Sequence, residues 1–312
     1  MSLALFVAAL PLLYWDAAPT SASELRRAGI ESLCVPPERV AEWRQAGLDL
    51  LPLTPAEREG RIRLKPPGIV ARGDWASATR RPWIDANLWR YQRQPQARYL
   101  ETAPSGLAAL AAAEAFAHGA DLVLEIDPGD LDSFGQALAL FRSLPQTSLP
   151  GVADLRVVDD GSFATGELMN LLVRRNLLFQ PVPRAAPGLP LVVELGSKAY
   201  PKSAAANPDT LALKIRAELG DERRSLRLYG SEVVLARLVG DAERLRLHLL
   251  NYGGREVEGL RVRIRGSWNP GSAHVLRHGS PALEALLVQE GFTEFSLPVL
   301  GPYAVVDLVA SH

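Results

Sequence analysis

The sequence predicts an α/β fold, a compact and irregular (β/α)8-type barrel, followed by a small antiparallel β-sandwich. Two observations support this prediction. From Tyr14 onward, short apolar runs alternate with amphipathic runs, as expected for βα units on a largely parallel sheet. Beyond Asp221 the polarity alternates with a period of two residues, as in antiparallel strands. We therefore expect a barrel domain over residues 1–222, with a sub-boundary near 145–152, and a sandwich over 223–312.

The barrel prediction depends on about eight or nine candidate strands, the number that an eight-stranded barrel needs. They are, in order, "LLYWD", "ESLCVP", "LDLLPL", "GIVAR", "PWIDA", "DLVLEID", "DLRVVDD", "LLFQPVP" and "PLVVELG". Short helices are expected between them. Thr20 or Ser21 can cap the first helix, and Gly29 can end it. The strongest helix is the alanine-rich "SGLAALAAAEAFAHG", from a Ser105 cap to Gly119.

A second arrangement of the first part is compatible with the same pattern. The proline-containing run "SLPQTSLPG", Ser143 to Gly151, could separate two open α/β units. Residues 154–220 would then form a small doubly wound module. We favour the barrel because of the number of candidate strands.

The expected sandwich begins with "SLRLYGSEVVLARLVGDAERLRLHLLNYGGREVEGLRVRIRG". Its Gly-Asp, Tyr-Gly-Gly and Arg-Gly steps are typical of hairpin turns. The run "TEFSLPVLGPYAVVDLVAS" adds two further strands, and "PALEALLVQ" is the strongest helical segment in this part.

The amino-acid composition limits the classes of function that are compatible with this chain. The hydrophobic fraction of 47% and charged fraction of 22% are those of a globular protein with a sizeable core. A net charge of −1 gives no overall positive electrostatic field that would attract nucleic acid. The single Cys34, which we expect in the core, excludes an intramolecular disulfide. The five histidines lack metal-ligand spacing, and neither a dinucleotide-binding nor a phosphate-binding glycine motif occurs, so we expect no metal and no cofactor.

The apolar N-terminal run "SLALFVAALPLL" has two interpretations. It has the length of a signal-peptide core, which would make the protein periplasmic or secreted, but no Lys or Arg precedes it. It can instead contain a buried first strand, Ala9 to Trp15, in a cytoplasmic protein, and we favour the strand. The run is too short to span a membrane, and no other segment is apolar enough. The sequence leaves the oligomeric state open.

Acidic residues mark the ends of several predicted strands, where function collects in parallel α/β sheets. Side chains alternate along a strand, so Trp83, Asp85 and Asn87 share one face. The acidic residues at these ends are Asp16, Asp85, Glu125, Asp127, Asp159 and Asp160. A pair of such carboxyl groups is what hydrolysis of a glycosidic bond needs.

We assign Glu125 as the proton donor of that pair, and Asp85 or Asp127 as nucleophile or base. Glu125 lies inside an apolar run, where a charge needs a partner. Any of the acidic residues can instead cap the helix that follows its strand. "DPGDLDS" and "DDGSFATGE" have the sequence of such turns.

Aromatic and amide side chains around Asp85 are the expected substrate contacts. Trp83, Trp89 and Tyr91 can stack on a sugar ring, and Asn87 can hydrogen-bond its hydroxyl groups. We add Asp16 and Asp160 as further binding residues. The same aromatic residues could serve only to pack a loop.

Two parts of the chain, the barrel region and the C-terminal region, resemble glycoside-hydrolase-like bacterial proteins. "YWDAAPTSASELRRAGIESLCVP" and "WIDANLWRYQR" are similar to the TIM-barrel type of catalytic domain, and "VVLARLVGDAERLRLHLLNYGGREVEGLRVRIRG" is similar to their C-terminal β-sandwich. "VVDDGSFATGELMNLLVRRNLLFQPV" resembles the glutamine-amidotransferase-like module of beta-galactosidase-type enzymes. The resemblance implies a carbohydrate ligand.

The sequence thus predicts a carbohydrate-active protein, a glycoside hydrolase with a carboxylate pair at the carboxyl rim of the barrel. The alternative is a non-catalytic carbohydrate-binding or scaffold protein on a degenerate glycosidase fold.

Overall fold

A computed structural model describes residues 10–70, 83–185, 188 and 190–311. The chain forms two compact units. Unit 1 contains Met1–Pro67 and Gln94–Ser148, and unit 2 contains Gly68–Arg93 and Leu149–His312.

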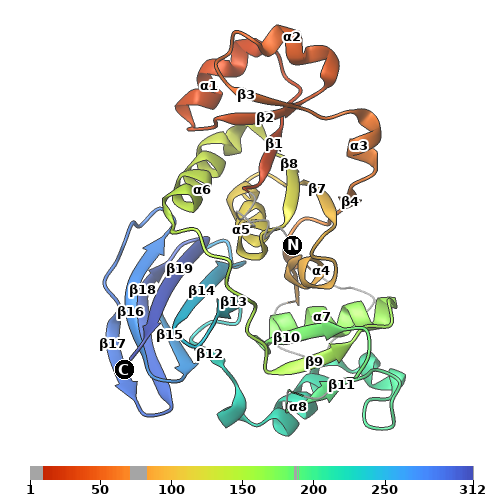
Figure 1. The fold of residues 1–312 in the computed structure, drawn as a ribbon, viewed down its shortest axis with the longest axis vertical. Helices are drawn as coiled ribbons and strands as arrows, with labels where there is room; N and C mark the ends of the chain where they lie inside the picture. Colours follow the sequence, from red (N-terminus) through yellow and green to blue (C-terminus); the bar gives the residue numbers. More distant parts are fainter. Residues whose placement is uncertain (1–9, 71–82, 186–187, 189, 312) are drawn as a thin grey trace, which may run out of the picture. The chain divides into compact units, whose positions relative to one another are not determined.

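Unit 1 is built on a six-stranded, wholly parallel sheet. Its strand order is β3-β2-β1-β8-β7-β4, and Figure 1 shows β1, β8 and β7 side by side. The strands are β1 (Leu12–Tyr14), β2 (Ser32–Val35), β3 (Asp49–Pro52), β4 (Ile62–Arg63), β7 (Arg98–Thr102) and β8 (Asp121–Glu125). The expected first strand is therefore confirmed over Leu12–Tyr14. The rest of the N-terminal run, residues 1–9, lies outside the described residues.

Helices connect the strands of unit 1, and their sequences explain where they begin. The helix α3 has a capping box, because Thr54 and Glu57 each accept a hydrogen bond from the other's backbone N–H. The helix α5 is buried along nearly its whole length, which its small alanine side chains permit. The helices are α1 (Ala22–Arg27), α2 (Val40–Trp43), α3 (Pro55–Glu59), α5 (Ala108–His118) and α6 (Leu131–Ser143), with short 3-10 turns at η1 (Pro19–Ser21), η2 (Pro37–Arg39) and η3 (Pro128–Asp130).

The two long helices of unit 1 pack closely. α5 lies against β8 and α6 lies against α5 (Figure 1). The rings of Phe116 and Phe141 stack between them with centroids 4.2 Å apart. Gly135 of α6 lies against the backbone of Ala28, so close that a Cβ atom would be 1.6 Å from the Ala28 carbonyl oxygen. Only glycine allows α6 to approach the end of α1 in this way.

Unit 2 begins with a short antiparallel pair. β5 (Gly68–Val70) pairs with β6 (Trp83–Asp85), with Gly68 opposite Asp85. The expectation that Trp83–Asp85 is a barrel strand is therefore wrong. Alternating polarity marks a strand without identifying its partner, and here the partner is the neighbouring run in sequence.

A three-stranded parallel sheet follows, in the order β10-β9-β11. Its helices include α4 and α7, which pack on each other. The elements are α4 (Leu88–Arg93), β9 (Leu155–Val158), α7 (Phe163–Arg174), β10 (Phe179–Val182), β11 (Val192–Val193), η4 (Lys202–Ala206), α8 (Pro208–Leu219) and η5 (Asp221–Arg223). The parallel strands of the chain are thus divided between two sheets. Among the described residues, closure into one eight-stranded barrel is not seen, and the division near Ser148 resembles the second arrangement.

The C-terminal part of unit 2 consists of two four-stranded antiparallel sheets that share one apolar core (Figure 1). Their orders are β12-β15-β18-β17 and β13-β14-β19-β16. The strands are β12 (Leu226–Tyr229), β13 (Val234–Gly240), β14 (Arg244–Asn251), β15 (Val257–Arg265), β16 (Trp268–Val275), β17 (Glu284–Gln289), β18 (Phe292–Leu300) and β19 (Tyr303–Ala310).

The edge strand β17 replaces the helical segment expected at "PALEALLVQ". Its register against β18 shifts between Glu284 and Leu287, and Ala285 has a left-handed backbone with a φ of 47°. All six residues of β17 are exposed, among them Leu286, Leu287 and Val288.

The parallel module and the sandwich are joined by hydrogen bonds inside unit 2. The amide of Val152 donates to the Leu238 carbonyl at 2.9 Å. The buried Asp154 accepts from the Ser225 amide at 3.0 Å and from the Ser225 hydroxyl at 2.6 Å. The side chain of Asn176 bridges the backbone of β13, donating to Val234 and accepting from Ala236.

Within the described residues, no helix combines the length and apolar character needed to cross a membrane.

Candidate functional site at the carboxyl edge of the unit 1 sheet

The strongest convergence of polar side chains in unit 1 lies where its parallel strands end. Tyr14 ends β1, Thr102 ends β7 and Glu125 ends β8. Arg58 comes from α3, the helix that follows β3. Because all strands of this sheet are parallel, their carboxyl ends share one edge.

Glu125 is the centre of this cluster. Its Oε1 accepts from Arg58 Nε at 3.0 Å and also from Arg58 Nη2. Its Oε2 accepts from the Thr102 hydroxyl at 2.7 Å. Both carboxyl oxygens of Glu125 therefore accept hydrogen bonds, from three donor groups in total. This arrangement suits an ionised carboxylate rather than a proton donor. The side chains of Glu125 and Arg58 keep 18% and 35% of their surface exposed, so the pair remains accessible to a ligand.

Tyr14 completes the cluster with an aromatic face. The guanidinium carbon of Arg58 lies 4.6 Å from the centroid of its ring. Burial raises the pKa of the Tyr14 hydroxyl, the charge of Arg58 opposes this shift, and the carboxylates of Asp16, Glu125 and Glu38 add to it. The phenol therefore remains protonated and can donate a hydrogen bond.

Asp16 stands at the rim of the same edge, just beyond β1. Its side chain is 71% exposed and lies 3.7 Å from Arg39 Nη1, which also donates to the Asp16 carbonyl oxygen. Because β1 and β8 are paired in parallel, Asp16 and Glu125 lie at the same edge of the sheet.

The acidic residues expected at two other strand ends form turns. Asp127 accepts from the Gly129 amide at 2.8 Å and caps the 3-10 turn Pro128–Asp130. Asp160, after β9, accepts from the Ser162 amide at 3.0 Å and from the Thr165 hydroxyl at 2.7 Å. These hydrogen bonds, those from Ser162 foremost, lower the pKa of Asp160 to about 2. Ser162 itself caps α7, since its hydroxyl accepts from the Thr165 amide.

Asp159, the other acidic residue at this end of β9, is paired with a cation. It receives two hydrogen bonds from Arg93, at 2.8 and 2.6 Å. The pair links β9 to the last residue of α4.

The aromatic stretch around Asp85 lies in unit 2. Asn87 and Tyr91 are each 1% exposed and Trp89 is 9% exposed. Leu88 to Tyr91 form the first turn of α4, and the carbonyl of the preceding Asn87 accepts from the amides of Arg90 and Tyr91. The side-chain oxygen of Asn87 also accepts from Arg90 Nη1 at 2.9 Å.

Protein groups cover the aromatic faces of this stretch. The guanidinium of Arg174 lies 3.5 Å from the Trp83 ring centroid, and that of Arg90 lies 4.5 Å from the Trp89 ring centroid. Trp89 also lies against Gly166 of α7, where a Cβ atom would be 2.9 Å from the indole. Asp85 is 3.4 Å from Arg90 Nη1. These residues therefore pack α4 against its surroundings.

Arg58, Tyr14 and Thr102 were not among the expected site residues. Tyr14 could have been found from "LLYWD", since it lies two residues before Asp16. Arg58 could have been found from the helix start "TPAERE" after the strand "LDLLPL". Thr102 ends a strand that the sequence pattern did not reveal.

Metal binding has no support among the described residues, because they contain no group of three or more His, Cys, Asp or Glu side chains that could hold an ion.

Comparisons with known proteins identify the class of fold. No protein-family model matches the chain, and no curated protein matches it. Among solved structures, alpha-L-fucosidase isoenzyme 2 from Paenibacillus thiaminolyticus is similar with a TM-score of 0.54 and 11% identity, over 87% of this chain and 70% of that one.

Two further glycosidases match with much lower scores. The maltogenic alpha-amylase of Thermotoga neapolitana has a TM-score of 0.27 at 8% identity, over 96% of this chain and 99% of that one. The family 30 xylanase of Clostridium acetobutylicum has a TM-score of 0.24 at 10% identity, over 96% and 95%. The fucosidase similarity shows that the fold is glycoside-hydrolase-like. A glutamine-amidotransferase-like character of residues 157–182 is not shown.

Proposed function

We propose that this protein recognises a carbohydrate at the carboxyl edge of the unit 1 sheet. The observation that supports the proposal is the convergence of Tyr14, Arg58, Thr102 and Glu125 from four different elements. A sugar presents hydroxyl groups that both donate and accept, and an apolar ring face. A carboxylate, a guanidinium and a phenol at one edge match these properties.

We favour binding over hydrolysis because of how Glu125 is held. Glycosidic hydrolysis needs one protonated carboxyl group to donate to the leaving oxygen. The two oxygens of Glu125 accept from Arg58 and Thr102, so this residue is arranged as an acceptor. The proton-donor role expected for Glu125 is thus not the one that its contacts favour.

Hydrolysis is the second candidate function, and one observation favours it. Asp16 lies just beyond β1 and Glu125 ends β8, the parallel strand paired with β1, so both carboxyl groups belong to the same edge. In this mechanism Glu125 is the nucleophile or base and the exposed Asp16 is the acid. Asp127 adjoins this edge but caps a turn, and Asp85 belongs to unit 2.

A glycan-array screen of the wild type, followed by calorimetry with the best ligand, tests the proposal. Glu125→Gln is expected to weaken binding about tenfold or more, because a charge-assisted hydrogen bond contributes on the order of 1.5–3 kcal/mol. The matched control is Asp121→Asn. Asp121 begins the same strand and is ion-paired with Arg61 at 2.7 Å, but lies at its opposite end. The control is expected to bind as the wild type does.

The two candidate functions give different results with aryl glycosides. Turnover by the wild type that is lost in both Glu125→Gln and Asp16→Asn would establish hydrolysis. Binding without turnover supports recognition alone. If the wild type binds no glycan, or if Glu125→Gln binds as tightly as Asp121→Asn, the proposed site is wrong.

A further inference from the structure

Unit 2 contains a cavity of about 480 Å³ whose lining is rich in arginine. It lies among the last turn of α7, the helix α8, the strand β12 and the turn that follows β12. The arginines that line it are Arg174, Arg175, Arg216, Arg224 and Arg227. One carboxylate, Glu232, lies among the other lining side chains. For a chain with a net charge of −1, this is a strong local excess of positive charge.

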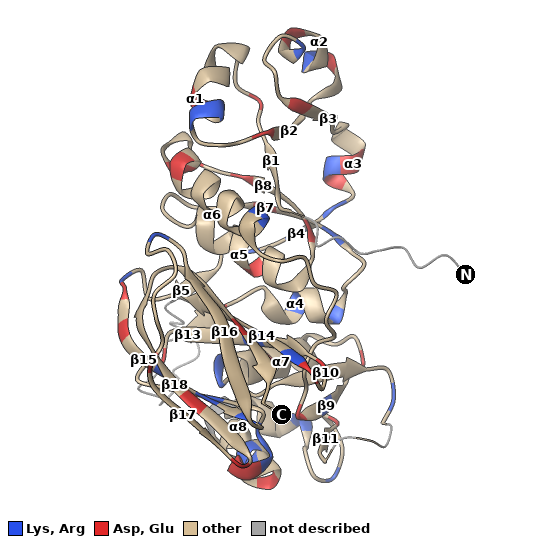
Figure 2. Cartoon of the chain, turned by 60° about the vertical axis from the view of Figure 1, so that its left-hand side comes forward, with Lys and Arg blue, Asp and Glu red and all other residues tan. Residues whose placement is uncertain are grey.

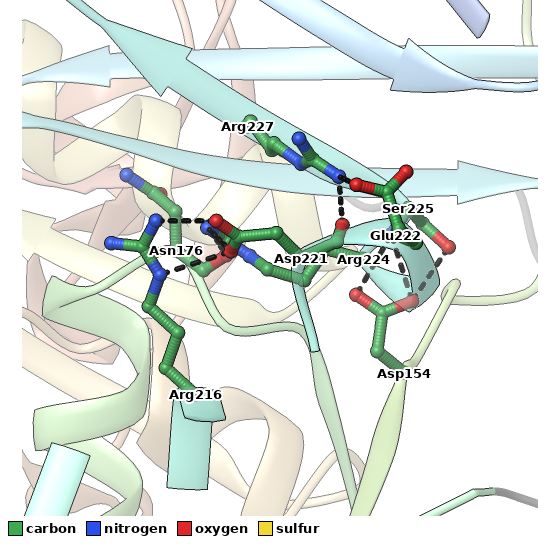
Figure 3. A network of polar contacts seen from close by, with 8 residues as sticks. All are labelled: Asp154, Asn176, Arg216, Asp221, Glu222, Arg224, Ser225 and Arg227. Atoms are coloured by element: carbon green, nitrogen blue, oxygen red, sulfur yellow. Dashed lines mark hydrogen bonds and ion pairs between the residues drawn. The ribbon is translucent and has the colours of Figure 1, made fainter. Parts of the chain in front are cut away.

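Three of these arginines are held in place by one short turn. Figure 3 shows Arg216 and Arg224 meeting at the carboxylate of Asp221. Arg216 donates from Nε at 3.0 Å and from Nη2 at 2.8 Å, and Arg224 donates from Nη1 at 3.3 Å. Arg227 donates to the Asp221 carbonyl oxygen. A single carboxylate thus positions more guanidinium groups than it can neutralise.

The remaining acidic partner in this turn is largely solvated. Glu222 lies 3.7 Å from Arg227 Nη2, but its side chain is 90% exposed, so it screens Arg227 weakly. Acidic and basic residues both occur around α8 and the start of β12 (Figure 2). The charged residues that line the cavity are nevertheless mostly arginine.

Arg224 is largely buried and has a hydrogen-bond donor that is not satisfied within the described residues. Its side chain is only 7% exposed, and its Nε atom is buried without a hydrogen-bond partner among the described residues. Its Nη2 is 3.4 Å from the Asn176 carbonyl oxygen. Burial lowers the pKa of the guanidinium. A buried cation with an unsatisfied donor is costly unless a ligand compensates it.

A second, smaller cavity of about 140 Å³ shares Arg224 and Arg227 with the first. It adds Arg263 and Arg265 from β15, together with Glu222 and Glu290. Arg224 and Arg227 therefore line both cavities. A ligand held by this pair could place charged groups on either side of it.

We propose that the arginine-lined cavity of unit 2 binds an oxyanion ligand that carries phosphate or sulfate groups, with Arg227 and Arg224 at its centre and Arg216 at its side. The planar guanidinium donates two parallel N–H bonds, which match the oxygens of these groups better than those of neutral ligands. Asp221 fixes the orientation of the guanidinium groups before the ligand arrives, which lowers the entropy cost of binding. This site is separate from the carbohydrate site proposed for unit 1.

Calorimetry of the full chain with inorganic phosphate, sulfate and pyrophosphate tests this proposal, with sodium chloride at matched ionic strength as the reference. We expect saturable binding of at least one oxyanion. A preference for pyrophosphate indicates a phosphorylated ligand, and a preference for sulfate indicates a sulfated one.

Variants of two arginines locate the binding. Arg227→Gln and Arg216→Gln are each expected to raise the dissociation constant about tenfold. Arg216 is 48% exposed on its side chain, so its replacement leaves folding intact even if that of Arg227 does not. The control is Arg244→Gln, an exposed arginine on β14 that does not line the cavity. The absence of saturable binding in the wild type, or an equal loss in the Arg244→Gln control, would overturn the proposal.

Discussion

At the scale of single residues, the same type of side chain serves different purposes according to its hydrogen bonds. Asp160 and Asp127 both follow predicted strands, but their oxygens accept from backbone amides two residues further on. Glu125 is instead the last residue of its strand, and it accepts hydrogen bonds from Arg58 and Thr102, which belong to other elements. The partners from distant parts of the chain, rather than the position at the strand end, distinguish a candidate ligand site from a turn.

A prediction about pH follows from Asp160. Its pKa is lowered to about 2, below the ordinary value of about 4. The carboxylate therefore contributes stability that is complete above about pH 4 and is lost as the pH falls through about 2. Asp160→Asn should lower the free energy of unfolding at pH 7, and the difference from the wild type should shrink towards pH 2.

Chemical denaturation across this pH range, with Asp132→Asn as the matched control, measures the effect. Asp132 is also exposed and near a helix start, but on α6. A difference between Asp160→Asn and the wild type that stays constant down to pH 2 would contradict the prediction.

At the scale of elements, the sequence revealed those with clear periodicity and clear ends. The helix α5 and the strands β1, β2 and β8 all correspond to predicted runs. The strand β7, which lies between β8 and β4, was missed because its Glu101 is charged although it is only 1% exposed. The segment "PALEALLVQ" has helical composition but forms β17, because pairing with β18 outweighs intrinsic preference.

The contact between α6 and the end of α1 provides a test at this scale. Gly135→Ala would place a Cβ atom 1.6 Å from the Ala28 carbonyl oxygen and 2.7 Å from its carbon, so the backbone must move. We expect a loss of about 1–3 kcal/mol in the free energy of unfolding. Gln136→Ala, at the exposed neighbouring position, should change it by no more than about 0.5 kcal/mol. Equal urea midpoints for the two variants would show that the contact is not close.

At the scale of the whole molecule, the sequence predicted the class of fold but not how its strands are grouped. Both the parallel α/β part and the antiparallel C-terminal part are present. The assignment of strands to one barrel was not possible from their number, since alternating polarity does not report which strands are neighbours. The site residues divide for the same reason: Glu125 lies in unit 1, and the aromatic stretch from Trp83 to Tyr91 lies in unit 2.

Because each proposed site is built within one unit, the two should be independent. Glu125→Gln should leave oxyanion binding unchanged, and Arg227→Gln should leave glycan binding unchanged, each within about twofold by calorimetry. A loss of both activities in either variant would show coupling between them or global unfolding. Circular dichroism of the same samples separates these two outcomes.

The shape of β17 has a consequence for the behaviour of the protein in solution. An exposed edge strand with Leu286, Leu287 and Val288 is a template on which another chain could add a strand. The shift in register after Glu284 and the left-handed Ala285 interrupt that template. Two carboxylates, Glu284 and Glu290, flank the apolar residues and would repel the same edge of a second molecule. The irregularity of this strand therefore protects the sandwich from aggregation through its own edge.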